Sequence, residues 1–270
     1  SDNITYNTTN LTISGTSEAN ASITLTSDQD GPRGTTTANG SGNWTIDISL
    51  TANLTHAVTA TATDTAGNTS VSSAALNITI DTSINTPLAL DLDASDDTGS
   101  SNSDNITSNT TNLTISGTSD ANDTITLTSD QDGNRGSTTA NGSGAWTIDV
   151  SLSANKTHAV TAVATDTAGN TSGSSAALNI TIDTTVNAPA ALDLAAADDT
   201  GDSTSDNVTN NTTNLTISGT SEANASITLT SDQDGNRGTT TANGSGNWTL
   251  DISLTANLTH AVTAVATDIA

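Results

Sequence analysis

The chain repeats itself with a period of 102 residues, and this repetition limits the folds that it can adopt. The segment Ser1–Thr5 recurs at Ser103–Thr107 and, with one Ile-to-Val change, at Ser205–Thr209. A unit of about 100 residues has the size of a domain rather than of a solenoid repeat. We therefore expect three domain-sized units in an excerpt of a longer array. Unit 1 (1–86) lacks its first strand, unit 2 (87–187) is complete, and unit 3 (188–270) lacks its last strand.

Within each unit, apolar residues alternate with polar ones, as in a half-buried β-strand. Trp44–Leu50 is the clearest such run, and turn-forming Gly and Asn separate it from its neighbours. No segment shows a helical period. We expect strands at 10–15, 22–27, 33–38, 43–50, 56–64, 74–81 and 89–93 and at their equivalents, with short linkers marked by Pro87 and Pro189. Seven short strands in about 100 residues predict an all-β rod of tandem immunoglobulin-like β-sandwiches.

Composition excludes several classes of function. The chain has 29 acidic residues and 4 Lys or Arg, a formal net charge of −25. Four cations cannot form the basic surface that a nucleic-acid partner needs. No apolar run is long enough to insert into a membrane in this segment, and the absence of cysteine excludes disulfides and thiolate metal sites. An acidic, cysteine-free, threonine-rich chain suits a secreted, extracellular protein at a cell surface.

Three linked motifs recur in order through the units. They are Ser41–Trp44 (Ser-Gly-Asn-Trp), His56–Ser70, and Asp96–Thr107, which begins Asp-Asp-Thr-Gly. Together they resemble the bacterial Ig-like repeats of giant RTX-type biofilm and surface adhesins, and the resemblance covers the whole chain. Asn7–Asn10 departs from it, because many such repeats carry Thr-Pro there. The resemblance implies an extender region: stacked sandwiches, often stiffened by Ca²⁺, that hold a ligand-binding tip away from the cell.

No residue pattern indicates catalysis. One histidine begins the same strand in each unit (His56, His158 and His260), and we expect a capping or edge role for it. Serine is abundant, but no nucleophile elbow or triad pattern is present. Trp44 and its equivalents open a strand on the inward parity, which favours the core over stacking on carbohydrate. We therefore expect no enzyme activity.

Carboxylates recur at fixed registers near strand ends and loops. Because in such a sandwich the loops at 28–32, 51–55 and 94–111 share one end, and the loops at 16–21 and 65–73 share the other, acids should gather at both ends. Ca²⁺ prefers clustered oxygen ligands, whereas a solvated acidic surface is the simpler alternative. The candidate ligands at the first end are Asp96, Asp97, Asp104, Asp130 and Asp132. Those at the second end are Asp120 and Asp166, joined by Asp81 or Asp183 from a preceding unit.

Asparagine forms the second recurrent signal. Of 30 Asn residues, 25 begin an Asn-x-Ser/Thr sequon, although the content of 92 Ser and Thr in 270 residues predicts about 10 by chance. Strand alternation writes such sequons automatically at Asn10, Asn43 and Asn77, but it does not explain those in loops. The sequence therefore predicts N-glycosylation of a surface fibre. The candidate sites are Asn10, Asn20, Asn39, Asn43, Asn68, Asn77, Asn112, Asn122, Asn141, Asn179 and Asn214.

The function predicted from these features is that of a structural stalk in a surface adhesin or extracellular filament. Its partners would be neighbouring repeats of the same array and other copies in a fibre. A module that binds carbohydrate or protein weakly at every repeat is the alternative, since repetition also serves multivalent binding. Exposed aromatic residues would favour that alternative, and Tyr6 is the only candidate. An accessory domain of a larger enzyme is a third hypothesis.

Overall fold

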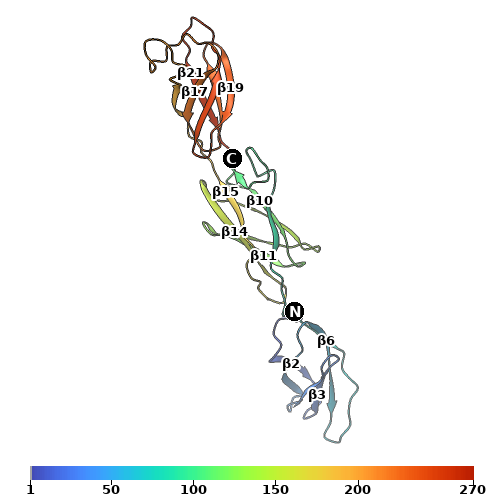
Figure 1. Cartoon of the computed structure of the whole chain (residues 1–270). Helices are drawn as coiled ribbons and strands as arrows, with labels where there is room; N and C mark the ends of the chain where they lie inside the picture. Colours follow the sequence, from blue (N-terminus) through green and yellow to red (C-terminus); the bar gives the residue numbers. More distant parts are fainter. Residues whose placement is uncertain (1) are drawn as a thin grey trace.

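A computed structural model describes residues 2–270 as three β-sandwich units, with no helix in the described range. Figure 1 shows the units arranged end to end along one direction, with the labelled chain ends beside the two joints between units. No helix of the described residues is long and apolar enough to cross a membrane. The predicted all-β tandem architecture is confirmed.

Unit 2 contains every strand of the repeat. Its smaller sheet has the order β13–β10–β8, and its larger sheet has the order β12–β11–β14–β15–β9. All pairs are antiparallel except β9 and β15, which are parallel. The strands are β8 (Leu88–Leu92), β9 (Ile106–Thr107), β10 (Leu113–Thr118), β11 (Thr124–Ser129), β12 (Gly133–Thr139), β13 (Ala145–Val150), β14 (Lys156–Thr165) and β15 (Leu178–Ile182).

Units 1 and 3 repeat this plan with fewer strands. Unit 1 comprises β1 (Ile4–Thr5), β2 (Leu11–Thr16), β3 (Ser22–Ser27), β4 (Gly31–Thr37), β5 (Asn43–Ile48), β6 (Leu54–Thr63) and β7 (Leu76–Ile80). Unit 3 comprises β16 (Ala190–Leu194), β17 (Leu215–Thr220), β18 (Ser226–Ser231), β19 (Gly235–Thr241), β20 (Asn247–Ile252) and β21 (Val262–Thr267). The parallel pair recurs in unit 1 between β1 and β7, and β21 of unit 3 pairs only with β18 among the described strands.

The strand alternation builds a separate core in each unit. In unit 2, the apolar faces of both sheets meet around Leu113, Ile125, Trp146 and Ile180, all of which are buried. Trp146 lies over Gly117 in the neighbouring strand β10, so closely that a Cβ at position 117 would collide with the indole ring. The same Gly–Trp pair recurs in units 1 and 3. The prediction that the tryptophan belongs to the core is confirmed.

The fourth strand lies in the larger sheet. In unit 1, β4 pairs with β3 and not with β5, so the larger sheet has the order β1–β7–β6–β3–β4. Each unit consequently has two poles. The N-terminal pole carries the turn between β10 and β11 and the segment after β14, and the C-terminal pole carries the corner between β8 and β10 together with the β11–β12 and β13–β14 loops. The predicted distribution of loops between the two ends agrees with this arrangement.

Candidate functional site at the poles and joints

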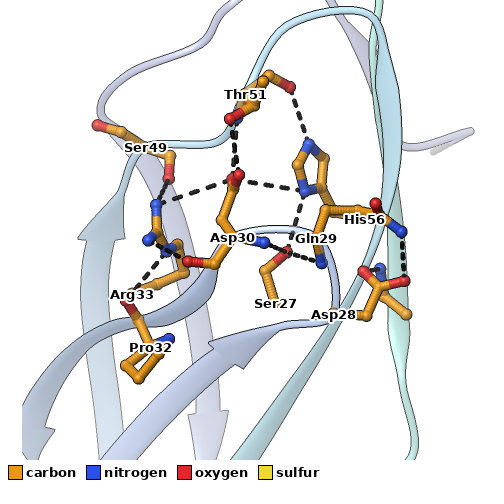
Figure 2. A network of polar contacts seen from close by, with 10 residues as sticks. Ser27, Asp28, Gln29, Asp30, Pro32, Arg33, Ser49, Thr51 and His56 are labelled. Carbon is orange, nitrogen blue, oxygen red and sulfur yellow. Dashed lines mark hydrogen bonds and ion pairs between the residues drawn. The ribbon is translucent and has the colours of Figure 1, made fainter.

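A polar network at the C-terminal pole surrounds the repeated histidine (Figure 2). His56 is fully buried, and its Nε2 donates to the Thr51 carbonyl at 2.8 Å. Its Nδ1 lies 3.0 Å from Ser27 Oγ and 3.6 Å from Asp30 Oδ2. Arg33 joins the network by donating to the Asp30 carbonyl. The expectation of a capping or edge histidine is wrong, because the loop between β5 and β6 folds over the ring and buries it.

This Ser–His–Asp group does not have the geometry of a hydrolase. Ser27 and Asp30 both approach the same ring nitrogen, whereas a catalytic triad places them on opposite nitrogens. Ser27 is 1 % exposed, so no substrate reaches its hydroxyl. Its Oγ also accepts the backbone N–H groups of Gln29 and Asp30, which closes the turn between β3 and β4. The network holds two loops of the pole together.

The acids of this turn are stabilised in their ionised form. The hydroxyl and backbone N–H of Thr51 donate to Asp30 and lower the pKa of its carboxyl group. In unit 2, Asp132 has a lowered pKa for the same reason, with Ser153 as donor. The Ala159 N–H and the Gln131 side chain lower the pKa of Asp130. Both carboxylate oxygens of each of these two predicted calcium ligands therefore already accept hydrogen bonds from the protein.

The corner between β8 and β10 contains a different set of acids. Asp97 is 4 % exposed, and its Oδ2 accepts the Asn105 N–H at 3.0 Å. Its Oδ1 is buried without a hydrogen-bond partner. Asp96 accepts the Thr114 N–H, and Asp104 accepts the Ile106 N–H. Unit 3 repeats the corner with Asp199, whose Oδ1 is again buried and unpartnered.

The joint between units 1 and 2 is held by polar contacts of the second set of predicted ligands. Asp120 accepts hydrogen bonds from the backbone and side-chain amides of Asn85 in the linker. Asp166 binds the Asn170 side chain, whose Nδ2 donates across the joint to the Asp81 carbonyl at 2.8 Å. The Asp183 carboxylate, in the next linker, accepts the Thr185 N–H.

Apolar contacts also cross the joints. The ring of Tyr6 lies over Gly169, since a Cβ there would be 3.2 Å from Tyr6 Cε1. Linker residue Ile84 packs against the core of unit 2. The second joint contains a backbone hydrogen bond instead, in which the Ser100 N–H donates to the Ile269 carbonyl at 3.0 Å. The single candidate aromatic residue therefore lies at a contact between units, although it is still half-exposed.

One buried acid at the first joint was missed by the sequence reasoning. Asp123 is 2 % exposed, and its Oδ2 accepts the Ser119 hydroxyl at 2.8 Å. Burial, together with the charges of Asp120 and Asp166, raises the pKa of Asp123. The equivalent residues are Ala21 and Ala225, so the signal in the sequence is a single Ala-to-Asp difference between otherwise similar repeats.

The two poles thus gather the predicted acids, but in separate hydrogen-bond networks. Within residues 2–270, no three His, Cys, Asp or Glu side chains converge as a ready-made metal site. Among the described residues, the buried carboxylate oxygens without a hydrogen-bond partner are Oδ1 of Asp97, Oδ1 of Asp199 and Oε2 of Glu222, and the two aspartates occupy the same corner of units 2 and 3. The calcium assignment remains a prediction, and the corner is where an additional oxygen ligand is available.

The candidate glycosylation residues are all exposed. Several also have a conformational role. Five of them have a positive φ between 53° and 69°, a region that Asn tolerates better than most residues: Asn10, Asn20, Asn112, Asn122 and Asn214. Asn39 accepts two backbone N–H groups in its turn, and Asn68 donates to Asp64. Turn geometry therefore supplies a reason for the loop asparagines that strand alternation does not.

Comparison with protein families matches the chain three times to one family, described as bacterial Ig-like domain, at 1–82, 83–184 and 185–270. The chain belongs to the bacterial Ig-like domain family. Such Ig-like domains are structural modules and not enzymes. A comparison with curated proteins found no match.

Three of the solved structures that are similar to the chain have low sequence identity to it. A biofilm-associated protein BSP domain is 18% identical over 66% of the chain, with a TM-score of 0.27, and the chain covers only 28% of that structure. Part of a 1.5-MDa bacterial ice-binding adhesin is 17% identical over 94% of the chain and 89% of its own, with a TM-score of 0.35. Fibronectin(III)-like modules of Clostridium thermocellum CbhA are 13% identical over 67% of the chain and 88% of their own, with a TM-score of 0.36. These similarities concern the fold alone.

Proposed function

We propose that the chain is an extender segment of a bacterial surface adhesin, which spaces a distal domain away from the cell. The observation that supports this function best is the path of the chain through unit 2. It enters at one pole through β8 and leaves at the opposite pole through β15, so each further unit adds its full length to the rod (Figure 1). A compact binding or catalytic protein has no need of such a path.

The joints support a stiff extender rather than a flexible tether. The Asn170–Asp81 bond crosses the first joint directly, and Asp120 fixes the linker residue Asn85. Ile84 adds an apolar anchor from the linker into unit 2. A linker that is hydrogen-bonded and packed on both sides restricts the angle between units, whereas a Gly- or Ser-rich linker would leave it free.

Spin–spin distance measurements test this function, because the chain has no cysteine and accepts labels at chosen positions. Thr45, Thr147 and Thr249 are exposed and equivalent in the three units. Labels at 45 and 147 report the first joint, and labels at 147 and 249 report the second. A stiff extender gives one narrow distance distribution for each pair. Broad distributions that reach short distances would contradict the proposal, and N170A, with S72A as a control away from the joint, should broaden only the first pair.

We propose in addition that Ca²⁺ strengthens the corner of units 2 and 3. Asp97 and Asp199 would hold it, since each has a buried carboxylate oxygen that nothing in the protein satisfies. Hard oxygen ligands of this kind are those that Ca²⁺ prefers. A bound divalent cation would supply the positive charge that the corner lacks, and a ligand that binds only the folded state stabilises it.

Calorimetry in calcium and in chelator at fixed ionic strength tests this site. Calcium should raise the unfolding temperature of unit 2, and D97N should abolish the increase. D130N is the matched control, because both oxygens of Asp130 are occupied by hydrogen bonds. Equal unfolding temperatures of the unaltered chain with and without calcium would exclude the site.

We also propose that sequons of the native fibre carry N-linked glycans. The support is exposure of every candidate Asn, strands included, with the intervening apolar residue directed inward. A glycan on Asn77 or Asn179 would cover the part of β7 or β15 that the two-residue strand β1 or β9 leaves unpaired, without disturbing the core. Intact-mass measurement of the native protein tests this directly: a mass equal to that of the bare chain would refute it.

A further inference from the structure

The chain passes through unit 2 in a way that loads one particular pair of strands when the rod is pulled. Tension along the rod acts backwards on β8, which begins the unit, and through the following corner on β9, and it acts forwards on β15, which ends the unit. Because β9 and β15 are parallel, these forces slide the two strands past each other. Their hydrogen bonds lie across the direction of sliding and must break together, whereas strands pulled from one end separate one bond at a time.

The contact between the two strands is short and well defined. The Thr181 N–H donates to the Asn105 carbonyl at 2.8 Å, and the Asp183 N–H donates to the Thr107 carbonyl at 2.9 Å. Ile106 and Thr107 are the whole of β9, and Thr107 is fully buried. A two-residue strand keeps its position only if something else holds it.

The corner that precedes β9 provides this hold. Asp97 accepts the Asn105 N–H at 3.0 Å, and the Asn105 carbonyl accepts the Thr181 N–H. The backbone of Asn105 therefore links Asp97 to β15. The Thr107 hydroxyl donates to the Asp96 carbonyl at 2.6 Å, and Thr98 Oγ1 lies 2.9 Å from Thr107 Oγ1. Asn105 has a φ of 59°, a conformation that turns its N–H toward the corner while its carbonyl faces β15.

We propose that β9 and β15 form the load-bearing clamp of unit 2 and that Asp97 is the positioning residue that holds β9 in this clamp. The inference rests on the proposed extender function only for its biological setting. A rod can be stiff at its joints without this clamp, so the distance measurements and the force measurements fail independently.

Units 1 and 3 each contain one of the two parts of the clamp, which are the parallel strand pair and the corner that holds its short strand. Unit 1 has the parallel pair, with the Thr79 N–H bonded to the Asn3 carbonyl and the Asp81 N–H bonded to the Thr5 carbonyl. Unit 3 has the corner, with the Asn207 N–H bonded to Asp199, but no parallel strand accompanies residues 207–209 in the described chain. When the 270-residue chain is pulled at its ends, unit 3 is loaded through β16 and the end of β21. Both ends lie at the same pole, so unit 3 unzips.

Force spectroscopy on the complete chain, attached at its two ends in chelator, tests the proposal. Extension of unit 2 from Leu88 to Asp183 releases roughly 33 nm of chain at about 3.5 Å per residue, and unit 1 from Ile4 to Asp81 releases roughly 27 nm. Unit 3 from Ala190 to Thr267 also releases roughly 27 nm, so the longer unit 2 event is the one that its length identifies. Unit 2 should unfold at the highest force of the three. A unit 2 event at or below the force of either shorter event would overturn the proposal.

Two substitutions sharpen the test. D97A removes a charge-assisted hydrogen bond and should speed the unfolding of unit 2 at constant force by about tenfold or more. D199A, which removes the same bond in unit 3, should leave the unit 2 event unchanged. T181P removes the β15 donor without touching the corner, and it keeps the test decisive if D97A does not fold.

A purely structural role for Asp97 predicts a different pattern. It would change unfolding in denaturant and unfolding under force by the same factor, whereas the clamp predicts a larger factor under force. Equal factors for D97A, or a unit 2 event unaltered by T181P, would refute the clamp.

Discussion

Replacing Asp123 with alanine should stabilise unit 2, although it removes a hydrogen-bonded side chain. Asp123 is 2 % exposed and accepts the neutral Ser119 hydroxyl, while the negative charges of Asp120 and Asp166 act on its carboxyl group. Units 1 and 3 fill the same position with the buried Ala21 and Ala225. The fold therefore accommodates a buried alanine at this position in the other two units.

The size of the effect follows from two opposing contributions. Removal of a buried carboxylate that has no cation beside it gains about 1–3 kcal/mol. Loss of the Ser119 hydrogen bond costs about 1 kcal/mol and leaves the hydroxyl in the state of Ser221 in unit 3, which is buried without a partner. The net gain is about 1 kcal/mol, which raises the unfolding temperature of a domain of this size by roughly 4–8 °C.

The gain should depend on pH. Burial raises the pKa of Asp123 in the folded state above its ordinary value of 3.8. The cost of its charge is therefore complete well above the folded-state pKa and disappears as the pH falls to 3.8. At pH 7, D123A should be more stable than the unaltered chain, and the two should converge on acidification.

Native-state hydrogen exchange of the β14 amides, which reports the opening of unit 2 alone, is the appropriate assay. The reciprocal substitution A21D should destabilise unit 1 at pH 7 and provides the matched control. A lower opening free energy for D123A at pH 7 would refute the reasoning, as would a gain that does not change between pH 7 and pH 4.

Three further outcomes are expected. W146A should lower the free energy of unfolding of unit 2 by about 3–5 kcal/mol in denaturant. G117A should also destabilise unit 2, since its added methyl group meets the indole ring of Trp146. A neutral effect of either substitution would contradict the core packing. Acidification below pH 3.8 should destabilise every unit, because the lowered pKa of acids such as Asp30 and Asp132 adds stability that is present above 3.8 and lost as the pH falls through the folded-state values; thermal melts from pH 5 to pH 2 measure this. H158A should loosen the β13–β14 loop and increase amide exchange at Ser153, whose carbonyl and hydroxyl are held by His158 and Asp132, and unchanged exchange there would contradict a structural role for the histidine.

The strand order along the chain was predictable, but the sheet assignment of the fourth strand was not. The β-branched threonines at 35–37 favour an extended strand but do not indicate which strand lies beside it. The turn decides it: Ser27 Oγ accepts two N–H groups of the loop that precedes β4, which folds β4 back on β3. The two-residue strands β1 and β9 also escaped prediction, because two residues show no alternation.

The candidate sites were predictable as registers and not as contacts. Repetition identified the acids, but it did not indicate their partners. In the structure, Asp132 accepts hydrogen bonds from Ser153 and Asp120 accepts them from the linker residue Asn85. Asp97 has one buried carboxylate oxygen without a partner. Which partner a carboxylate meets depends on loop paths that the period of the sequence does not encode. The histidine was misjudged for the same reason, since its burial depends on the loop above it. Asp123 was visible in principle, as a departure from the repeat at a position that is apolar elsewhere.

Small-angle X-ray scattering of the 270-residue chain tests the central claim, that the units form an extended rod, most directly. Each unit is at least as long as the ten-residue strand β14, about 33 Å, so three units in line exceed about 100 Å. A rod of that length has a radius of gyration of about 30 Å or more, whereas a compact chain of 270 residues has one of about 19 Å. A value near 30 Å, unchanged between low and moderate salt, is the predicted result. A value near 19 Å would contradict the extender account.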